Sequence, residues 1–586
     1  MDSMNIGKTF ISEKFSNTVD SFWVIINPGI LINPFDFVSV NNLNNTKTIG
    51  MVKDLQRIFL SGDSKYKDFY ISSTENFAGK DAGWSGIGVT ISRVAVMANI
   101  SSGDFPNPSD NNDDNTRKIA NNISALSINM PVEEGKLVDF ASAEEVIESL
   151  GIPEMENPIP AGIIEMTNGT LIPINLDVSY IFGPDTAHVN ASGISGNLKT
   201  SYLLFLLQVI YHTLLEEKIA LILFNTKEKD LLSINKNKDD NLDQKDKELL
   251  KILNIELPFF QNVKYFLPRG NNGKPNSAYI PEGYYKTYSY ELSDVYDRLE
   301  LLFHSDAIYD PRYNISSIIN YVYESWSLVN GIDTTKNISK KIKNWTDLIN
   351  FNGYPEGIVT NKSTLLKFQG SIQRFKRPST LFVDKKITST YLGNEIKQLK
   401  KDDVFVIDIA MLSSLEEQAF VIGDVMRTID EMYSHGQTDS YTNDENNNKS
   451  HTNNKPKYIL ILLDEINRYL PHLDSHGSTY GTKTILRSAV AEEILKTLIA
   501  GKSRHTILLS AQQFKSQVDS LLNDNTGLHV FTKLGLSELS TPPYSIIDDV
   551  TKTAISKLHR GEIVLTHPAF RHSIKITIPK PTFKRP

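Results

Sequence analysis

A glycine-containing segment that precedes a long helical stretch has the residue types that bind phosphate groups. Residues 193–200 read GISGNLKT, which approaches the pattern Gly-x-x-x-x-Gly-Lys-Ser/Thr. Backbone N–H groups of such a loop and the amino end of the following helix would surround phosphate oxygens. Lys199 would contact the β- and γ-phosphates of a nucleotide, and the Thr200 hydroxyl would bind Mg²⁺. The predicted nucleotide-binding residues are Gly193, Ser195, Gly196, Asn197, Leu198, Lys199, Thr200 and Ser201.

This segment departs from the pattern at one position. Leu198 stands where the glycine before the lysine belongs, which leaves open whether Leu198 weakens the binding of ATP. Taken alone, the segment is as typical of a Gly/Ser/Asn turn before an amphipathic helix as of a phosphate-binding loop. A second signal is therefore needed to decide between the two readings.

The second signal is a pair of carboxylates, Asp464 and Glu465, that follow the apolar run ILILL at 459–463. In P-loop enzymes the first acid of such a pair holds the Mg²⁺ and its water shell, and the second polarises the attacking water. Adjacent acids at a strand end are common, so the pair alone is weak. Together and in this order, the two signals predict an ATPase that uses ATP and Mg²⁺, with Thr200 and Asp464 as metal ligands and Glu465 and Lys199 as catalytic residues.

Two further polar segments lie at the ends of apolar runs. Gln512 and Gln513 close the run ILLS at 507–510, where a polar side chain would sense the γ-phosphate; we favour Gln512 over Gln513. Asp230 follows the run that ends at Phe224 and would act at the nucleotide site through another residue. A solvated loop acid is an equally good reading of Asp230.

The composition excludes several classes of function. The chain has 586 residues, no cysteine and a formal net charge of −8. Without cysteine there are no disulfides, no thiol catalysis and no Cys-ligated metal sites, which fits a cytoplasmic protein. The acidic balance argues against a protein that coats nucleic acid with its whole surface, although a local basic lining remains compatible with it. The longest apolar run, 202–215, is too short to span a bilayer, so we expect no membrane partner.

The elements that would position these residues change in type along the chain. The N-terminal part carries short β-branched and aromatic runs punctuated by Gly, Pro and Asn, which predict a small barrel or sandwich. Two later strand-like runs, 161–167 and 170–177, are expected to complete it, and the polar residues 101–122 are expected to form an exposed loop. We therefore predict a β-barrel domain over residues 1–180. The N-terminal runs are 22–26, 35–40, 48–52 and 89–98.

From residue 181 to residue 586, continuous apolar runs alternate with helical stretches such as 199–218. Continuous rather than alternating runs predict parallel strands covered on both faces, and hence an α/β fold. A mainly helical insertion is expected at about 285–400, and a low-complexity, Asn-rich loop at 433–457. The predicted strands are 188–191, 219–224, 404–409, 458–463, 506–510 and 530–534.

These segments resemble the HerA/FtsK family of ring-shaped P-loop ATPases, and HerA-like DNA translocases in particular. The similarity is carried by HVNASGISGNLKTS at 188–201, FNTKEKDLL at 224–232, LLDEINRYLP at 462–471 and ILLSAQQ at 507–513. Residues 23–52 resemble the small N-terminal barrel (HAS-barrel) of that family, and residues 561–581 resemble its closing segment. The matched segments extend over nearly the whole chain, with long unmatched insertions between them.

The resemblance implies a RecA-like core with a mostly parallel sheet, an N-terminal β-barrel and a helical insertion. It also implies a homohexameric ring that moves double-stranded DNA through its pore in a helicase-like manner. A partner effector would dock on the ring, either a nuclease or a sirtuin-like NAD-consuming protein, in DNA processing or bacterial antiviral defence. A trans-acting arginine is expected on the helix and turn before the sensor strand, where Arg504 is favoured over Arg487 and Lys502.

Two other functions remain open at this stage. The first is a nucleotide-binding ring that assembles and activates a partner effector with little hydrolysis of its own, which Leu198 and the acidic charge favour. The second is a P-loop motor that acts on protein or RNA. No constellation of paired acids and a lysine typical of a nuclease stands out, so any DNA cleavage is assigned to a partner.

Overall fold

The structure is a computed structural model, and within the residues it describes the chain divides into two compact units. Unit 1 comprises Met1–Val178, Gln244–Glu256 and His529–Pro579, and unit 2 comprises Ser179–Asp243, Leu257–Leu528 and Lys580–Pro586. The described residues are 5–43, 46–61, 86–101, 130–183, 187–194, 196, 198–237, 242–271, 274–303, 315–327, 341–359, 361–376, 380–435, 454–472, 488–501 and 503–584.

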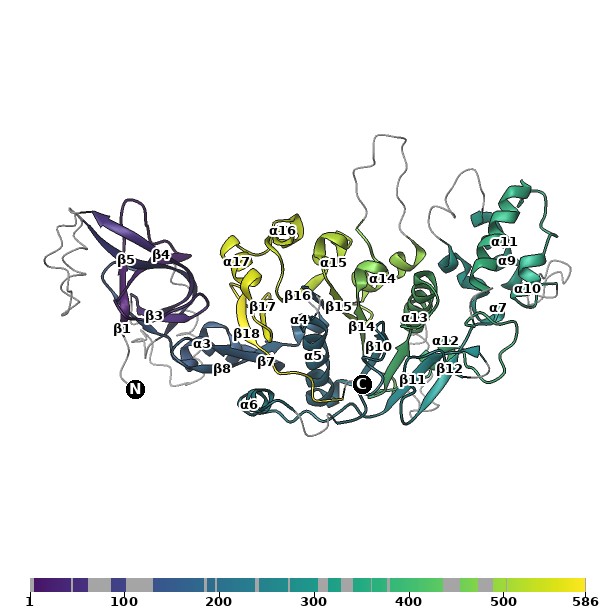
Figure 1. Cartoon of the computed structure of the whole chain (residues 1–586), viewed down its shortest axis with the longest axis horizontal. Coiled ribbons are helices and arrows are strands. Elements are labelled where there is room, and N and C mark those ends of the chain that lie inside the picture. Colours follow the sequence, from purple (N-terminus) through teal and green to yellow (C-terminus); the bar gives the residue numbers. More distant parts are fainter. Residues whose placement is uncertain are drawn as a thin grey trace, which may run out of the picture. The chain divides into compact units, whose positions relative to one another are not determined.

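Unit 1 begins with a closed antiparallel barrel in the order β1-β2-β5-β4-β3-β6 (Figure 1). Its interior is filled by alternate apolar side chains, among them Phe22, Val38 and Val94, which are almost fully buried. Closure pairs every strand on both sides and leaves no free sheet edge. The strands are β1 Asn5–Phe10, β2 Ser21–Ile26, β3 Phe37–Asn41, β4 Thr46–Ser61, β5 Gly86–Ser101 and β6 Leu137–Phe140.

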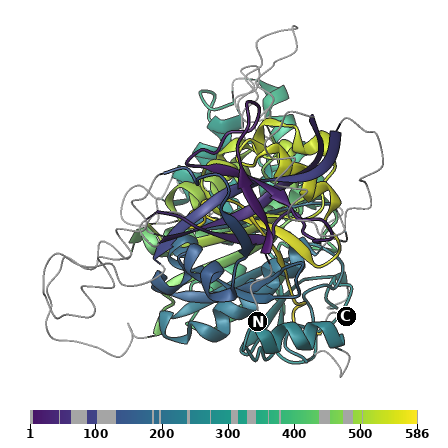
Figure 2. The same cartoon turned by 90° about the vertical axis from the view of Figure 1, so that its left-hand side faces the viewer.

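Strands β4 and β5 are much longer than the other barrel strands and pair along their whole length, as the purple and dark blue ribbons of Figure 2 show. Two register shifts, between Ile49 and Gly50 and between Val52 and Asp54, mark irregularities in this ladder. Such irregularities bend a strand and increase its twist. They allow one pair of strands to contribute both to the barrel wall and to a two-stranded extension.

The strands expected to complete the barrel pair with other strands of unit 1, in a sheet distinct from the barrel. β7 (Pro158–Glu165) pairs with β8 (Leu171–Asp177) as a hairpin, and Ile163 of β7 pairs with Thr577 of β18. Gly162 permits this approach, because a Cβ there would lie 2.9 Å from the Thr577 carbonyl oxygen. The expectation that these strands close the barrel was wrong, because an alternating pattern specifies a strand but not its partner.

The same sheet corrects the strand expected at 530–534. β16 (Thr526–Phe531) starts earlier and pairs antiparallel with β17 (Glu562–Thr566), which pairs antiparallel with β18 (Ile574–Thr577). A continuous apolar run reports burial on both faces and not the direction of the neighbouring strand. The helices of unit 1 are α3 Ala143–Ser149, α6 Gln244–Ile252, α16 Leu536–Leu539 and α17 Asp549–Lys557.

Unit 2 is built on a parallel sheet in the order β12-β11-β13-β10-β14-β15-β9. The pairings among these strands are parallel, which confirms the α/β prediction. Strands β11 and β12 were not predicted, and β12 occupies the first residues of the expected helical insertion. The strands are β9 Ala187–Ser192, β10 Ile219–Asn225, β11 Val263–Pro268, β12 Tyr285–Tyr288, β13 Val404–Asp408, β14 Tyr458–Asp464 and β15 Thr506–Gln512.

The order of these strands defines a RecA-like P-loop core. The strand that precedes the glycine-containing loop, β9, and the strand that ends in Asp464, β14, are separated by one strand, β15. Helix α5 (Lys199–Thr213) follows the loop, and its residues from Tyr202 to Tyr211 are all buried. A helix that is apolar on all sides requires cover on all sides, so α5 is a core element of unit 2.

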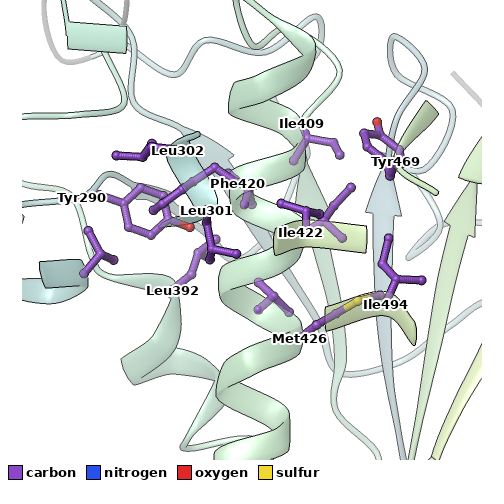
Figure 3. Close-up of a cluster of buried hydrophobic side chains, with 14 of the residues drawn as sticks. Tyr290, Leu301, Leu302, Leu392, Ile409, Phe420, Ile422, Met426, Tyr469 and Ile494 are labelled. Carbon is purple, nitrogen blue, oxygen red and sulfur yellow. The ribbon is translucent and has the colours of Figure 1, made fainter. Parts of the chain in front are cut away.

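The insertion between β12 and β13 shares its hydrophobic core with the sheet. Helix α13 (Leu415–His435) carries Phe420, Ile422 and Met426, which pack with Tyr290 and Leu392 of the insertion (Figure 3). Ile409, Tyr469 and Ile494 of the core belong to the same cluster. The insertion is therefore part of unit 2. Its helices are α7 Leu292–Val295, η4 Tyr296–Leu302, α9 Ile315–Ser327, α10 Trp345–Asn350, α11 Lys362–Lys376 and α12 Leu392–Ile396.

The remaining helical elements in the described part of unit 2 are α4 Ser179–Phe182, η2 Leu215–Glu217, η7 Ile466–Arg468, α14 Ala489–Ala500, η8 Lys515–Gln517 and α15 Ser520–Asp524. The loop expected at 101–122 and most of the loop expected at 433–457 lie outside the described residues. A search of the described helices finds none whose length and apolar character would let it cross a bilayer.

Candidate nucleotide site

The glycine-containing loop connects the carboxyl end of β9 to the amino end of α5, the position that a phosphate-binding loop requires. Gly196 has a φ of +85° and Leu198 a φ of +64°. Leu198 thus adopts the left-handed conformation that a glycine would adopt at the same position, at a cost of roughly 1–2 kcal/mol for a residue with a side chain. Gly193 is buried and its N–H donates to the Gln512 carbonyl, whereas Ser195 and Asn197 lie outside the described residues.

Lys199 is the first residue of α5 and is almost completely buried, at 4% exposure. Among the described residues, its ammonium group has no hydrogen bond or ion pair. Burial lowers the pKa of Lys199 from its usual value, and the nearby Asp464 carboxylate only partly offsets that effect. A buried cation at a helix amino end has a large desolvation cost unless an anion arrives, which is the electrostatic condition for binding a phosphate group.

Thr200 and Asp464 meet, although they are far apart in the sequence. The Thr200 hydroxyl donates to Asp464 Oδ2 at 2.9 Å, and the Asp464 side chain is only 6% exposed. The contact arises from the register of the sheet, in which Asp464 pairs with Ala511 and Gln512 pairs with Ser192 of β9. The carboxyl ends of three parallel strands therefore end at one level, where ligands of open α/β sheets bind.

Glu465 follows directly, in the left-handed conformation with a φ of +54°. Its N–H donates to Asp464 Oδ1 at 2.8 Å, and Arg468 Nη1 lies 3.4 Å from Glu465 Oε2. The Glu465 side chain is 22% exposed, more than that of Asp464. A carboxylate that is held at the edge of the site but accessible to water is suited to accept a proton from an attacking water.

Lys227 is a site residue that the sequence-based prediction missed. Its ammonium group donates to Asp464 Oδ2 at 2.8 Å and lies 3.2 Å from Glu465 Oε1. Burial opposes the charged form, but the attraction of Asp464 and Glu465 together raises the pKa of Lys227 above its usual value. The available signal was its place in FNTKEKD, just after the strand that neighbours β14, where only Asp230 was considered. The Asp230 residue is exposed, and the structure gives its side chain no contact with either acid.

Gln512 is placed at the carboxyl end of β15 and is completely buried. Its amide forms a reciprocal pair with Asn190 of β9: Gln512 Nε2 donates to Asn190 Oδ1 at 2.7 Å, and Asn190 Nδ2 donates to Gln512 Oε1 at 2.8 Å. Asn190 Nδ2 also donates to Ser510 Oγ. The pair ties the strand before the loop to β15, and the sensor role of Gln512 stays a prediction.

Arg504 precedes β15 and forms an ion pair with Asp430 of α13 within the same chain. Its position before the amino end of the strand separates it in the fold from the carboxyl-end cluster of Thr200 and Asp464. A trans-acting role would require it to reach a neighbouring subunit and remains a prediction. Ser201 is buried on α5, and the alternatives Arg487 and Lys502 lie outside the described residues.

The residues present fit a magnesium nucleotide. A threonine hydroxyl and an aspartate carboxylate are hard oxygen donors of the kind Mg²⁺ prefers, and they already touch each other. The Lys227 ammonium now donates to the same Asp464 oxygen, which shows that this oxygen accepts a positively charged partner. Lys199 and the amino end of α5 provide the positive potential that phosphate oxygens need.

Comparisons with known proteins add structural neighbours only. No family model matches the chain, and the search of curated proteins finds no match. The bacterial conjugative coupling protein TrwB with ADP and Mg²⁺ is 11% identical, over 71% of this chain and 89% of that chain, with a TM-score of 0.36. The genome packaging NTPase B204 from Sulfolobus turreted icosahedral virus 2, with ATP-gammaS, is 8% identical over 32% of this chain and 72% of that chain, with a TM-score of 0.20.

Proposed function

We propose that this protein is an ATP-hydrolysing P-loop motor. The observation that carries the proposal is the Thr200–Asp464 hydrogen bond beside the buried, positively charged Lys199, at the carboxyl edge of a parallel sheet. Two segments separated by more than 260 residues in sequence supply the phosphate-binding and metal-binding groups of one site. A turn before a helix, the alternative reading of the loop, does not require an aspartate partner for Thr200.

The proposed chemistry assigns one role to each side chain. Lys199 neutralises charge on the β- and γ-phosphates, and the loop N–H groups orient them. Thr200 and Asp464 hold Mg²⁺, which when bound neutralises phosphate charge in the transition state. Glu465 orients the attacking water and accepts its proton. Gln512 is proposed to report the γ-phosphate through its contact with the loop strand, and Arg504 is proposed to act in trans.

The finer parts of the proposal follow from the resemblance to HerA/FtsK ATPases. We propose a cytoplasmic hexameric ring that translocates double-stranded DNA for an effector partner, a nuclease or a sirtuin-like protein, in DNA processing or antiviral defence. The division into a barrel domain at residues 1–180 and an ATPase core at 181–586 is proposed on the same ground. Sedimentation of the purified protein with and without ATP would test the ring, with a hexamer expected.

The decisive experiment is steady-state ATP hydrolysis with and without linear duplex DNA, beside Glu465→Gln. We expect hydrolysis that rises with DNA and falls roughly a hundredfold or more in the variant, because a positioned base contributes at least this factor. Gln keeps the size and a hydrogen-bonding oxygen but cannot take a proton. Equal hydrolysis in both proteins would exclude Glu465 as the base.

One observation favours a second candidate function, a nucleotide-gated scaffold with little hydrolysis. Lys227 engages both Asp464 and Glu465, the two acids that hydrolysis requires. A ring in which this contact persists after ATP binding would bind nucleotide and assemble a partner without turnover. Negligible hydrolysis by wild type and Glu465→Gln alike, with or without DNA, together with intact ATP binding, would support the scaffold.

A further inference from the structure

Lys227 holds the one carboxylate that the proposed magnesium site depends on. Asp464 Oδ2 accepts hydrogen bonds from both the Thr200 hydroxyl, at 2.9 Å, and the Lys227 ammonium, at 2.8 Å. The other oxygen, Oδ1, accepts from the Glu465 N–H at 2.8 Å. Both oxygens of this nearly buried carboxylate are therefore engaged, and a cation that binds Oδ2 has to share it with the ammonium group.

The loop that carries Lys227 is built to keep it there. Asn225, the last residue of β10, donates from Nδ2 to the Glu228 carbonyl and to Asp408 Oδ1, both at 2.8 Å, while its Oδ1 accepts from the Leu231 N–H at 3.2 Å. These contacts fix the loop from both sides of Lys227. The fold thus fixes the loop backbone at Lys227, whereas the side chain itself, 37% exposed, can move.

The contact has a direct electrostatic consequence for metal binding. Two positive charges at Asp464 Oδ2 repel each other, and the 6% exposure of the carboxylate limits the screening of this repulsion by water. Direct binding of Mg²⁺ to this oxygen therefore favours release of the ammonium, and the 37% exposed Lys227 side chain has solvent to move into. Glu465 Oε1, 3.2 Å from the same ammonium, offers Lys227 a second anion to stay with.

We propose that Lys227 is an internal counter-ion that competes with the divalent cation for Asp464 and gives up that carboxylate when Mg–ATP binds. This inference rests on the proposed function, because Asp464 is a metal ligand only if the site binds a metal nucleotide. In the empty site Lys227 neutralises the two acids. When Mg–ATP is bound, Lys227 stays paired with Glu465 and no longer contacts Asp464, which then binds the metal. Metal binding is therefore coupled to a rearrangement of the contacts of Asp464 and Glu465.

The test measures divalent-cation binding to the nucleotide-free protein, with Mn²⁺ as a paramagnetic probe for electron spin resonance. We expect Lys227→Met to bind Mn²⁺ at least about tenfold more tightly than wild type, because an uncompensated pair of acids remains. Lys229→Met, which removes the same charge two residues further along the loop, should leave the Mn²⁺ affinity within about twofold of wild type. Equal affinities in wild type and Lys227→Met would overturn the proposal.

Two more variants separate charge from structure. Lys227→Arg keeps the positive charge and should bind Mn²⁺ as weakly as wild type; tight binding by this variant would also overturn the proposal. Adding Asp464→Asn to Lys227→Met should abolish the gain in Mn²⁺ affinity. A gain that persists would mean that Lys227 does not compete with the cation for Asp464. If Lys227→Met does not fold, Lys227→Gln carries the same expectation with a polar side chain of similar length.

A parallel measurement tells failure of this inference from failure of the proposed function. Binding of a fluorescent ATP analogue is compared between wild type and Lys199→Ala. Absence of nucleotide binding in wild type would refute the ATPase proposal, and a gain in Mn²⁺ affinity in Lys227→Met would then show only that Lys227 competes with a divalent cation at Asp464. Nucleotide binding that depends on Lys199, with no Mn²⁺ gain in Lys227→Met, would keep the ATPase and reject the counter-ion.

Discussion

Among the charged clusters in the described part of unit 2, two differ clearly in how completely their charges are partnered. In the first, beneath the helical insertion, Arg298 donates from Nη1 to Asp424 Oδ1 and Thr428 Oγ1, both at 2.7 Å, and from Nη2 to both carboxylate oxygens of Glu431. In the second, at the carboxyl edge of the sheet, Lys199 is buried with no described partner and Lys227 serves two acids.

The difference supports a structural role for the first cluster and agrees with the ligand-binding role proposed for the second. A buried charge is tolerated when it is paired and hydrogen-bonded, and the Arg298 side chain, 3% exposed, meets that condition through Nη1 and Nη2, although Arg298 Nε and Asp424 Oδ2 are buried without a hydrogen-bond partner. The carboxyl-edge cluster leaves a cation desolvated and adopts left-handed backbone at Leu198 and Glu465. Uncompensated charge and backbone strain gather at functional sites, where a ligand completes the interactions. The following variants test this contrast.

The largest effect is expected for Arg298→Met. Removing the guanidinium leaves Asp424 buried without its partner and should lower the free energy of unfolding by about 3–5 kcal/mol. Urea unfolding followed by tryptophan fluorescence measures this, because Trp345 lies in the same core. Arg374→Met is the control: that arginine is 70% exposed, so its loss should cost less than about 0.5 kcal/mol. Equal losses of unfolding free energy in the two variants would show that the Arg298 cluster does not stabilise the fold.

Lys199→Met should show the opposite pattern. Hydrolysis of ATP is expected to fall roughly a hundredfold to a thousandfold, as when one charge-stabilising donor is removed from a transition state. The free energy of unfolding should stay the same or rise, because a buried cation with a lowered pKa is replaced by an apolar side chain of similar length. A large loss of stability without loss of hydrolysis would assign Lys199 to the scaffold.

His188, near the start of β9, has a buried imidazole ring with both nitrogens partnered, and we expect it to make the stability depend on pH. Its Nδ1 accepts from the Leu508 N–H and its Nε2 lies 3.0 Å from the Leu498 carbonyl oxygen, so the neutral ring satisfies both. Burial lowers the pKa of His188 to about 4. The unfolded chain then binds more protons between pH 6.5 and about 4, so stability is full above pH 6.5 and falls by about 3 kcal/mol as the pH drops through that window.

The measurement for His188 is thermal unfolding from pH 7.5 to 4, compared between wild type and His188→Asn. Asn tolerates the φ of +69° at this position and can still accept from the Leu508 N–H. The variant should therefore be less stable at pH 7.5 but lose less stability on acidification. Parallel curves for the two proteins would show that His188 does not titrate in this range.

Gln512→Ala and Asn190→Ala probe the amide pair between β15 and β9. Each single variant should lower the free energy of unfolding by about 1–3 kcal/mol, because it leaves a buried amide unsatisfied. The double variant should cost little more than one single variant, since both lose the same pair. The proposed γ-phosphate sensor role adds a second expectation, that Gln512→Ala reduces ATP hydrolysis more than Asn190→Ala does. Equal effects of the two variants on hydrolysis would leave Gln512 with a structural role only.

The smallest effect is expected for Leu198→Gly. Glycine adopts the φ of +64° without strain, but its unfolded chain is more flexible, and the two effects nearly cancel. Stability should change by less than about 1 kcal/mol, and affinity for a fluorescent ATP analogue should stay within about threefold of wild type. A tenfold gain in affinity would mean that Leu198 obstructs the phosphate position.

Much of the fold was predictable because burial leaves a direct trace in the sequence. The runs at 219–224, 458–463 and 506–510 became strands β10, β14 and β15, as continuous apolar segments in an α/β protein should. Strand partners were less predictable. The hairpin β7–β8 was expected in the barrel, and β16 was expected to be parallel, because side-chain patterns encode which faces are buried but not which strand is adjacent.

By itself, the sequence determined which residues follow the buried strands: Lys199 and Thr200 after one, Asp464 and Glu465 after another. These residues stand out because polar groups end continuous apolar runs. Only the tertiary structure decided that Thr200 meets Asp464 and that Lys227 joins them. The reason is the register of parallel strands, in which Leu223 lies beside Leu462 and the residues that follow both strands come to one edge. Register depends on the packing of the whole sheet, so in the sequence Lys227 is only one charge among several in a loop.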